Sequence, residues 1–423
     1  MKTNHLFLAI SILYLSSFVW SCKAIQEMPQ CEIVEKKYGN RSLNTQDSVT
    51  VVATTLYRGG LIKKMFQGRG YRKAWETPIT VPMVRLDTLF GGLEPIEKGG
   101  GEQTQSLELH DAKGNAYTLR SVNKDPRSLV PDFAEKLRIG GIVTDGISAQ
   151  HPYGALVVPP MQDALGLWHT APRTIFVAPQ EALDSFNLQF QNRIYFIEYE
   201  TSGNGEWTGL DNIKEITSTE GIQKLDAKHD NFEIDTANLV RARLFDLVIG
   251  DWDRHAKNWG WVVTETDDKI LATVMACDRD NTFYGIGGVI PWFINRPFMM
   301  PLLRPFKKRI DYLPGMIKPF DSYFLLGVPE SVYQKEAAYI KTHLTDEVIE
   351  DALRVWPDEL YDIDAKRISK KIKARRDKLH RYARKFPKIL DKRGPLEDPL
   401  KGSTKFWEKQ TGKKSQRKRI GFG

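Results

Sequence analysis

Three polar residues in the second half of the chain have the types and spacing needed for phosphoryl transfer. Asp253 lies five positions before Asn258, within residues 249–261, and Asp278 follows twenty positions after Asn258. One acid can accept the proton of an attacking hydroxyl, while an amide and a second acid can hold the metal that bridges ATP phosphates. The spacing therefore predicts Asp253 as the catalytic base and Asn258 and Asp278 as ligands of Mg²⁺ or Mn²⁺.

Two ordered elements are expected to position these residues. Apolar side chains recur at helical spacing from Asp235 to Gly250, which predicts a helix that begins and ends at these residues. Residues 271–275 are apolar and predict a strand that leads toward Asp278. The catalytic loop and the metal carboxylate are thus both expected in polar segments that directly follow an ordered element.

A glycine-rich loop leads into a predicted hairpin in the first half of the chain. Its glycines are Gly99, Gly100 and Gly101. Residues 106–109 alternate between polar and apolar types, residues 111–115 have turn composition, and residues 116–122 predict the second strand.

The remaining segments indicate an α+β fold. Strands are predicted at residues 49–58, 173–177 and 193–197, irregular packed structure at 59–98, and mostly helices beyond about residue 300. Strands followed by helices are typical of α+β proteins. The expected divisions are a signal at 1–22, a linker at 23–48, a β-rich region at 49–200, a helical region at 201–393 and a basic tail at 394–423.

The first 22 residues predict export. Lys2 precedes an apolar stretch at residues 6–19 that is too short to span a membrane, and Ser21 then precedes Cys22. A small residue before a cysteine at this place resembles a bacterial lipobox, which predicts lipid modification of Cys22 and a membrane anchor on the outer membrane or periplasmic face of the envelope. The alternative is an ordinary secretory signal that is cut elsewhere.

Composition excludes several classes of protein. The 423 residues are 27% charged and 41% hydrophobic, with only three cysteines, which excludes a disulfide framework. Of the net charge of +8, seven units belong to residues 401–419, so the body is nearly neutral and no nucleic-acid partner is expected. This tail either contacts anionic lipid or polymer or is simply a solvated segment.

Ordered motifs give the chain a resemblance to known kinases. Residues 250–258 resemble the catalytic loop of atypical kinases, namely the Golgi casein kinase and four-jointed family, phosphatidylinositol kinases and HipA-type toxin kinases. Six ordered segments are similar to exported bacterial kinase-like domains, some of which are fused to metallophosphatases; these segments are residues 68–75, 99–107, 120–125, 151–153, 251–258 and 278–280. The resemblance covers roughly residues 50–390, and no metallophosphatase signature is present. It implies a bilobal protein-kinase-like fold with a β-rich N-lobe and a helical C-lobe.

The resemblance also implies roles for individual residues. Gly99, Gly100 and Gly101 would cover the nucleotide phosphates, with hydrogen bonds from Gln103, Thr104 and Ser106. His255 would orient the catalytic loop beside Asp253. Glu198, after a predicted strand, would lie at the hinge that meets the adenine.

One position departs from the kinase pattern. Arg120 stands where protein kinases keep a strand lysine, and Lys124 is the alternative cation for the phosphates. Asp145 is the expected acidic partner, with Glu135 as its alternative. Two functions follow: an ATP-dependent enzyme that phosphorylates an unknown protein, glycan or lipid, or a pseudokinase scaffold that binds a partner in the envelope, where ATP is scarce.

Overall fold

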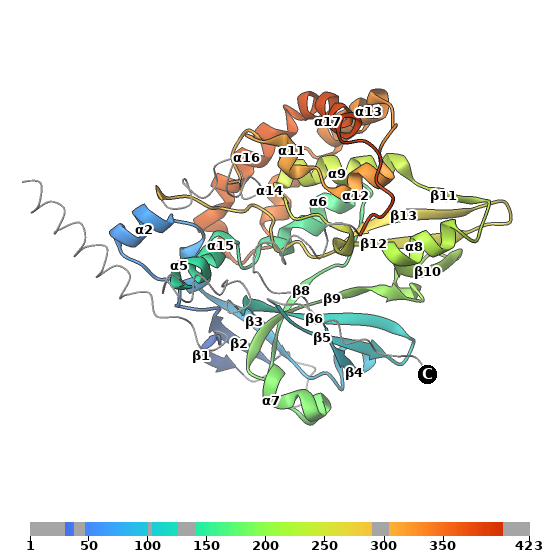
Figure 1. Ribbon diagram of the computed structural model, residues 1–423. Coiled ribbons are helices and arrows are strands. Elements are labelled where there is room, and N and C mark those ends of the chain that lie inside the picture. The colour runs from blue at the N-terminus through green and yellow to red at the C-terminus, as the bar shows by residue number, and fades with distance from the viewer. Residues whose placement is uncertain (1–29, 38–46, 100–103, 126–139, 290–303, 401–423) are drawn as a thin grey trace, which may run out of the picture.

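Figure 1 shows the structure, a computed structural model that describes residues 30–37, 47–99, 104–125, 140–289 and 304–400. Several expectations lie outside the described residues: the signal with Cys22, the residues Gly100, Gly101, Gln103 and Glu135, and the tail from residue 401. No helix in the described part is long and apolar enough to cross a membrane.

Thirteen strands of the described chain belong to one mixed sheet. They are β1 (Glu32–Lys37), β2 (Ser48–Val52), β3 (Pro78–Val84), β4 (Leu93–Lys98), β5 (Thr104–Asp111), β6 (Asn115–Lys124), β7 (Trp168–His169), β8 (Arg173–Val177), β9 (Arg193–Gly203), β10 (Ile213–Ser218), β11 (Phe232–Ile234), β12 (Trp259–Glu265) and β13 (Ile270–Ala276). The main path runs β1-β2-β3-β8-β9-β10-β12-β13-β11, with β4, β5 and β6 attached through β9 and β7 attached to β13.

Most helices follow the strands in sequence. They are α2 (Leu61–Gln67), α3 (Arg72–Glu76), α5 (Gly140–Asp145), α6 (Val158–Ala164), α7 (Asn187–Phe190), α8 (Thr219–Asp226), α9 (Thr236–Ile249), α11 (Leu313–Met316), α12 (Pro319–Phe324), α13 (Glu330–His343), α14 (Asp346–Leu353), α15 (Asp358–Leu360), α16 (Lys366–Arg376) and α17 (Leu379–Arg393). In Figure 1 the strands β1 to β6 lie on one side of the molecule and α9 to α17 on the other, so the α+β fold with two lobes is confirmed.

Local chemistry explains the elements around the site. Asp235 caps α9 by accepting a hydrogen bond from the backbone nitrogen of Asn238, and Gly250 ends the helix in the left-handed conformation, with φ of 74°. The expected hairpin is confirmed as β5 and β6, which pair antiparallel across a turn that begins at Asp111. Nearly every residue of β6 is buried, because β5 and β9 flank it.

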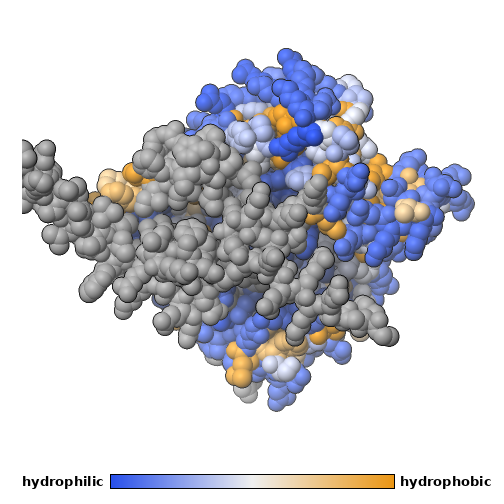
Figure 2. Space-filling view, viewed as in Figure 1, coloured by the Kyte–Doolittle hydropathy of each residue, from blue (hydrophilic) through white to orange (hydrophobic). Residues whose placement is uncertain are grey.

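The sheet and the helices share a core. One cluster of buried apolar side chains joins β2 and β3 to α9 and α17; its members include Val49, Val51, Ile79, Leu239 and Leu390. A second cluster lies between β5, β6, β8 and β9. The described surface in Figure 2 is mainly hydrophilic, although α2 exposes Leu61, Ile62 and Met65.

The structure corrects several sequence-based boundaries. Residues 59–98 are not irregular but contain α2, α3, β3 and β4, because helices this short carry little periodicity and prolines interrupt both strand patterns. The expected linker at 23–48 contains β1, a charged strand at the sheet edge. The strand expected over residues 49–58 ends at Val52, and the helical region at 201–393 also contains four strands, β10 to β13.

Candidate functional site

A β-hairpin brings together two loops, the catalytic loop with Asp253 and Asn258 and the loop with Asp278, called the metal loop below. Asn258 directly precedes β12 and Asp278 lies two residues after the end of β13, and the two strands pair with Trp259 opposite Ala276. The backbone nitrogen of Cys277 donates to the carbonyl of Asn258 at 3.2 Å. Because the ends of an antiparallel hairpin meet, residues twenty positions apart in sequence become neighbours.

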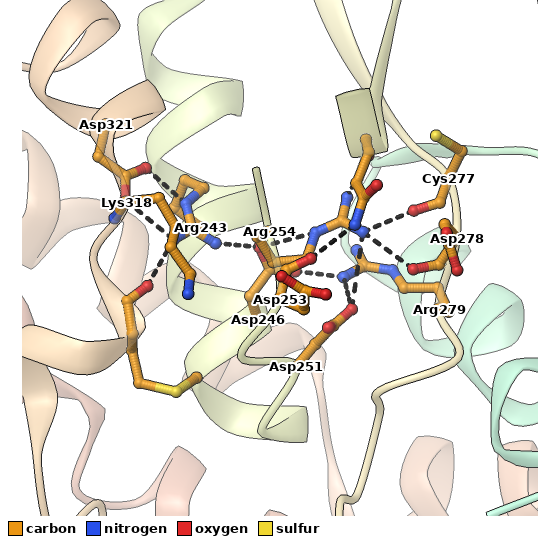
Figure 3. A network of polar contacts seen from close by, with 12 residues as sticks. Arg243, Asp246, Asp251, Asp253, Arg254, Cys277, Asp278, Arg279, Lys318 and Asp321 are labelled. Carbon is orange, nitrogen blue, oxygen red and sulfur yellow. Dashed lines mark hydrogen bonds and ion pairs between the residues drawn. The ribbon is translucent and has the colours of Figure 1, made fainter. Parts of the chain in front are cut away.

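Arg254 fastens the two loops to each other. Its buried guanidinium donates to the carbonyl oxygen of Cys277 at 2.5 Å, of Asn258 at 2.6 Å and of Asp278 at 3.3 Å (Figure 3). The same guanidinium lies 4.2 Å from the ring centroid of Trp259. The Arg254 side chain thus holds the backbone of Cys277 and Asp278 against the catalytic loop.

Buried ion pairs connect helix α9 to both loops. Asp246, on α9, accepts hydrogen bonds from Arg243 and Arg279, and Arg279 also donates to Asp251 at 2.9 Å (Figure 3). Burial opposes the charge of Asp246, but the guanidinium groups of Arg279, Arg254 and Arg243 outweigh it and lower the pKa of Asp246. Each buried charge of this network therefore has an opposite charge beside it. The ion pairs can hold the catalytic loop in place without an unpaired buried charge.

The amide side chain of Asn258 contacts the backbone of Asp253, the expected base. The side-chain nitrogen of Asn258 donates to the backbone carbonyl of Asp253 at 2.6 Å, which closes the five-residue loop. Asp253 itself is 8% exposed. This bond uses the amide nitrogen of Asn258 and leaves the amide oxygen as the atom suited to a metal.

Asp278 joins the two lobes. Its backbone has φ of 52°, an uncommon left-handed conformation for a residue other than glycine, and its side chain is 27% exposed. A carboxylate oxygen lies 2.6 Å from Nη2 of Arg120, on β6. Burial raises the pKa of Asp278, but the charges of Arg120 and Lys124 outweigh burial and hold this pKa well below its usual value.

Glu198, rather than Asp145, is the acidic partner of Arg120 within the N-terminal sheet. Nε of Arg120 lies 3.4 Å from Glu198, on the adjacent strand β9. The expectation for Asp145 was wrong, because this carboxylate pairs with Arg72 at 2.7 Å and with Lys63 at 2.9 Å instead. Both cations precede it by more than 70 residues, so sequence proximity could not reveal them.

Glu198 lines a small cavity, and its expected contact with adenine stays a prediction. It accepts a hydrogen bond from the hydroxyl of Thr170, and both residues line a cavity of about 10 Å³ together with Phe196 and Asp280. Such a cavity has room for roughly one water molecule. Burial raises the pKa of Glu198 to about 7, against the opposing effects of Arg120 and Thr170.

Lys124, the second cation, lies beside Thr104, the first described residue after the glycines. Lys124 forms an ion pair with Asp280 and donates to the hydroxyl of Thr104 at 2.7 Å. Gly99 donates from its backbone to Ser106 at 3.0 Å, and a β-carbon at Gly99 would lie only 2.1 Å from the Ser106 hydroxyl. A side chain at this position would therefore require the Ser106 hydroxyl to rotate away.

His255 lies two residues after Asp253 and is half-buried. Its Nδ1 atom has no hydrogen-bond partner in the described part of the chain. Burial lowers the pKa of its imidazole below the usual 6.5, although Asp253 and Asp278 act in the opposite direction. This direction favours a neutral imidazole at pH 7, and the role of His255 in the catalytic loop stays a prediction.

The residues fit a magnesium or manganese ion that arrives with a nucleotide. Asp278 offers a carboxylate and Asn258 an amide oxygen, which are hard ligands of the kind these metals prefer. Among the described residues, no group of three or more His, Cys, Asp or Glu side chains could hold a metal ion. Two protein ligands suit an ion whose other ligands are phosphate oxygens and water.

Sequence reasoning missed most of the supporting groups. Arg254 and Arg279 lie inside recognised motifs, where their neighbourhood signalled importance but not a role. Asp321 lies in a segment without a readable motif, and only the fold brings it to Arg243 on α9 (Figure 3).

Comparisons with known proteins add little to this description. No known protein family and no curated protein matches the chain. One similar solved structure is a proinflammatory kinase of Helicobacter pylori, CtkA, with 13% identity over 68% of this chain and 95% of that chain, and a TM-score of 0.35. At this TM-score and identity the similarity does not indicate a function for this chain.

Proposed function

We propose that this chain is a kinase that transfers the γ-phosphoryl group of ATP to a hydroxyl of a protein, glycan or lipid. One observation carries the proposal: Arg120 of the N-terminal sheet reaches Asp278 at 2.6 Å, beside the loop that holds Asp253 and Asn258. A cation suited to phosphate then contacts a carboxylate suited to a metal, and Arg254 joins the loop of that carboxylate to the loop of the expected base. Phosphoryl transfer needs this division of labour.

Each residue has a distinct part in the proposed reaction. Asp253 accepts the proton of the acceptor hydroxyl, whose oxygen forms a bond to the γ-phosphorus while the bond to the β-γ bridging oxygen breaks and ADP leaves. Asn258 and Asp278 would hold the metal, which when bound offsets the charge of the phosphates. Arg120 pairs with a phosphate oxygen, and Arg254 keeps both loops in place.

Nucleotide binding can be tested by the melting temperature of the full chain with ATP and either Mg²⁺ or Mn²⁺. A ligand at a hundredfold excess over its Kd stabilises the folded state by about 2.7 kcal/mol. We expect a metal-dependent rise that Asp278→Ala removes. Asp267→Ala, an exposed acid at the other end of the same hairpin, is the matched control and should keep the rise. No rise with any nucleotide would sink the proposal.

Turnover separates an enzyme from a binding scaffold. Removal of a catalytic base typically lowers the rate by about 10²- to 10⁴-fold. We expect Asp253→Ala to lose autophosphorylation and ATP hydrolysis to this extent while it keeps the nucleotide-dependent rise in melting temperature. Arginine in place of the strand lysine favours the second candidate, a pseudokinase, and binding without turnover in the unaltered chain would establish it.

We also propose that the protein acts in the bacterial envelope, anchored through a lipid on Cys22. The support is the sequence of residues 1–22 alone. Cys22→Ala should abolish incorporation of labelled palmitate and release the protein from the membrane fraction. Equal membrane association of both forms would contradict the anchor.

A further inference from the structure

Helix α2 displays apolar side chains to the solvent. Leu61, Ile62 and Met65 are 86%, 55% and 56% exposed. They lie on one face of the helix, because positions 61, 62 and 65 are within about 100° of one another around its axis. Orange and tan atoms mark this face at the left of Figure 2, where Figure 1 places α2. Contiguous apolar side chains in water are unfavourable and are typical of surfaces that bind a protein or a membrane.

A buried arginine holds α2 in this orientation. The guanidinium of Arg72 donates to the carbonyl oxygen of Tyr57 at 2.7 Å and to that of Gly68 at 3.0 Å, so one side chain fixes the chain before and after the helix. Arg72 also pairs with Asp145, which binds Lys63 of α2 at 2.9 Å. Lys63 lies on the side of the helix opposite Leu61, so this ion pair keeps the apolar face directed outward.

The charges around this face are mostly positive. Residues 48–75 include six basic residues and no acidic one. Four of the six share two carboxylates: Arg58 and Lys73 pair with Glu76, and Lys63 and Arg72 pair with Asp145.

The other two cations, Lys64 and Arg69, are exposed. Lys64 follows Leu61 by three positions and is therefore its neighbour on the helix surface, while Arg69 follows the end of the helix. An apolar face bordered by cations suits an anionic bilayer, because apolar side chains enter the acyl region and cations meet the phosphate headgroups.

The start of β1 lies close to the segment that leads into α2. Glu32 is opposite Val52 of β2 and accepts a hydrogen bond from the hydroxyl of Thr55, six residues before Leu61. Cys22 precedes Glu32 by ten residues, which span at most about 35 Å when extended. A lipid on Cys22 would therefore keep the bilayer near this edge of the protein.

We propose that α2 is a membrane-contact site, which inserts Leu61, Ile62 and Met65 among the acyl chains of an anionic bilayer while Lys64 and Arg69 meet its phosphate headgroups. The inference is independent of kinase activity and rests in part on the proposed envelope location. A lipid anchor and α2 together would fix which side of the protein faces the membrane.

Photolabelling tests this contact in the full chain. Vesicles of phosphatidylglycerol and phosphatidylethanolamine carry a phospholipid with a diazirine in its acyl chain, and mass spectrometry identifies the labelled peptides. We expect labels within residues 59–69 and none at Leu188, which is 90% exposed but lies on α7, away from α2 (Figure 1). Vesicles of phosphatidylcholine should give about fivefold less label on α2. No label on α2, or equal label at Leu188, overturns the inference.

A substitution on the exposed face gives a second test. Leu61→Asp should lower the label on α2 about tenfold, while the control Leu188→Asp should not. Both side chains lie mainly in solvent, so both melting temperatures should stay unchanged. Self-association that Leu61→Asp disperses, without any label from vesicles, would assign this face to a second copy of the chain and overturn the inference.

The lipid anchor and the α2 contact can fail separately. Label on α2 in a chain that incorporates no palmitate supports the α2 contact and overturns the anchor alone. Palmitate incorporation without label on α2 overturns the α2 contact alone.

Discussion

Two carboxylates share Arg120 yet ionise differently. Asp278 lies 2.6 Å from the guanidinium and also feels Lys124, and its pKa is held far below the usual value. Glu198 lies at 3.4 Å, is more deeply buried and has Asp278 and Asp280 nearby, so its pKa rises to about 7. Environments that push two neighbouring acids apart are typical of sites that move protons or charged groups.

The raised pKa of Glu198 makes the stability of the protein depend on pH. Because the folded pKa of about 7 exceeds the ordinary 4.5, the protonated form stabilises the fold fully below pH 4.5, and this stabilisation is lost as the pH rises through 7. The free energy of unfolding should fall by at most about 3 kcal/mol over this window.

Urea unfolding of Glu198→Gln between pH 5 and 8 checks this expectation. The variant should show a flatter dependence than the unaltered chain, because its amide does not titrate. Glu206→Gln, at an exposed glutamate, is the matched control and should keep the original slope. The same slope in both variants would contradict the assignment to Glu198.

Among the secondary-structure elements, the C-terminal ends of α9 and β13 determine where the site residues lie. α9 ends at Gly250 and β13 ends at Ala276, and the loops that follow carry Asp253 and Asp278. A hairpin register fixes one loop against the other, while the buried strand β6 delivers Arg120 from the opposite lobe. Errors at any of these ends would move a functional group by several ångströms, since each residue advances a strand by about 3.3 Å.

Gly250→Ala should be strongly destabilising because two effects add. Gly250 has φ of 74°, which costs other residues about 1–2 kcal/mol, and a β-carbon there would lie 2.5 Å from Phe306. Gly327 has φ of 82° but no atom within 4 Å of the added carbon. Thermal unfolding should show Gly327→Ala losing about 1–2 kcal/mol and Gly250→Ala at least about 1 kcal/mol more. Equal losses would mean that Phe306 moves aside freely.

At the scale of the whole molecule, the two lobes are joined more through their core than through the sheet. In the described part of the chain, β9 pairs with β10 at Gly203 and Ile216 alone, whereas side chains from β2, β3, α9 and α17 share one buried cluster. Arg120 with Asp278 adds a polar contact across the same boundary.

The shared core predicts one cooperative unfolding transition. Loss of the helical region would expose the apolar faces of β2 and β3, so neither lobe is expected to stay folded alone. Circular dichroism at 222 nm and tryptophan fluorescence should give coincident urea transitions. Two separate midpoints would show that the lobes unfold independently.

The sequence by itself determined the features that depend on local chemistry. The limits of α9, the hairpin of β5 and β6, and the spacing from Asp253 to Asn258 follow from caps, turn residues and periodicity. The fold class also follows from the sequence, because predicted strands precede predicted helices along the chain, as in other α+β proteins.

Only the tertiary structure decided the partners of the buried charges. Arg72 pairs with Asp145, Glu198 and Asp278 both pair with Arg120, and Asp321 pairs with Arg243 from a segment without a motif. A charge pairs with whatever opposite charge the fold brings within a few ångströms, and chain distance does not limit that choice. Sequence patterns report local propensity and burial, so they suggested candidate reacting groups but not the network of charges around them.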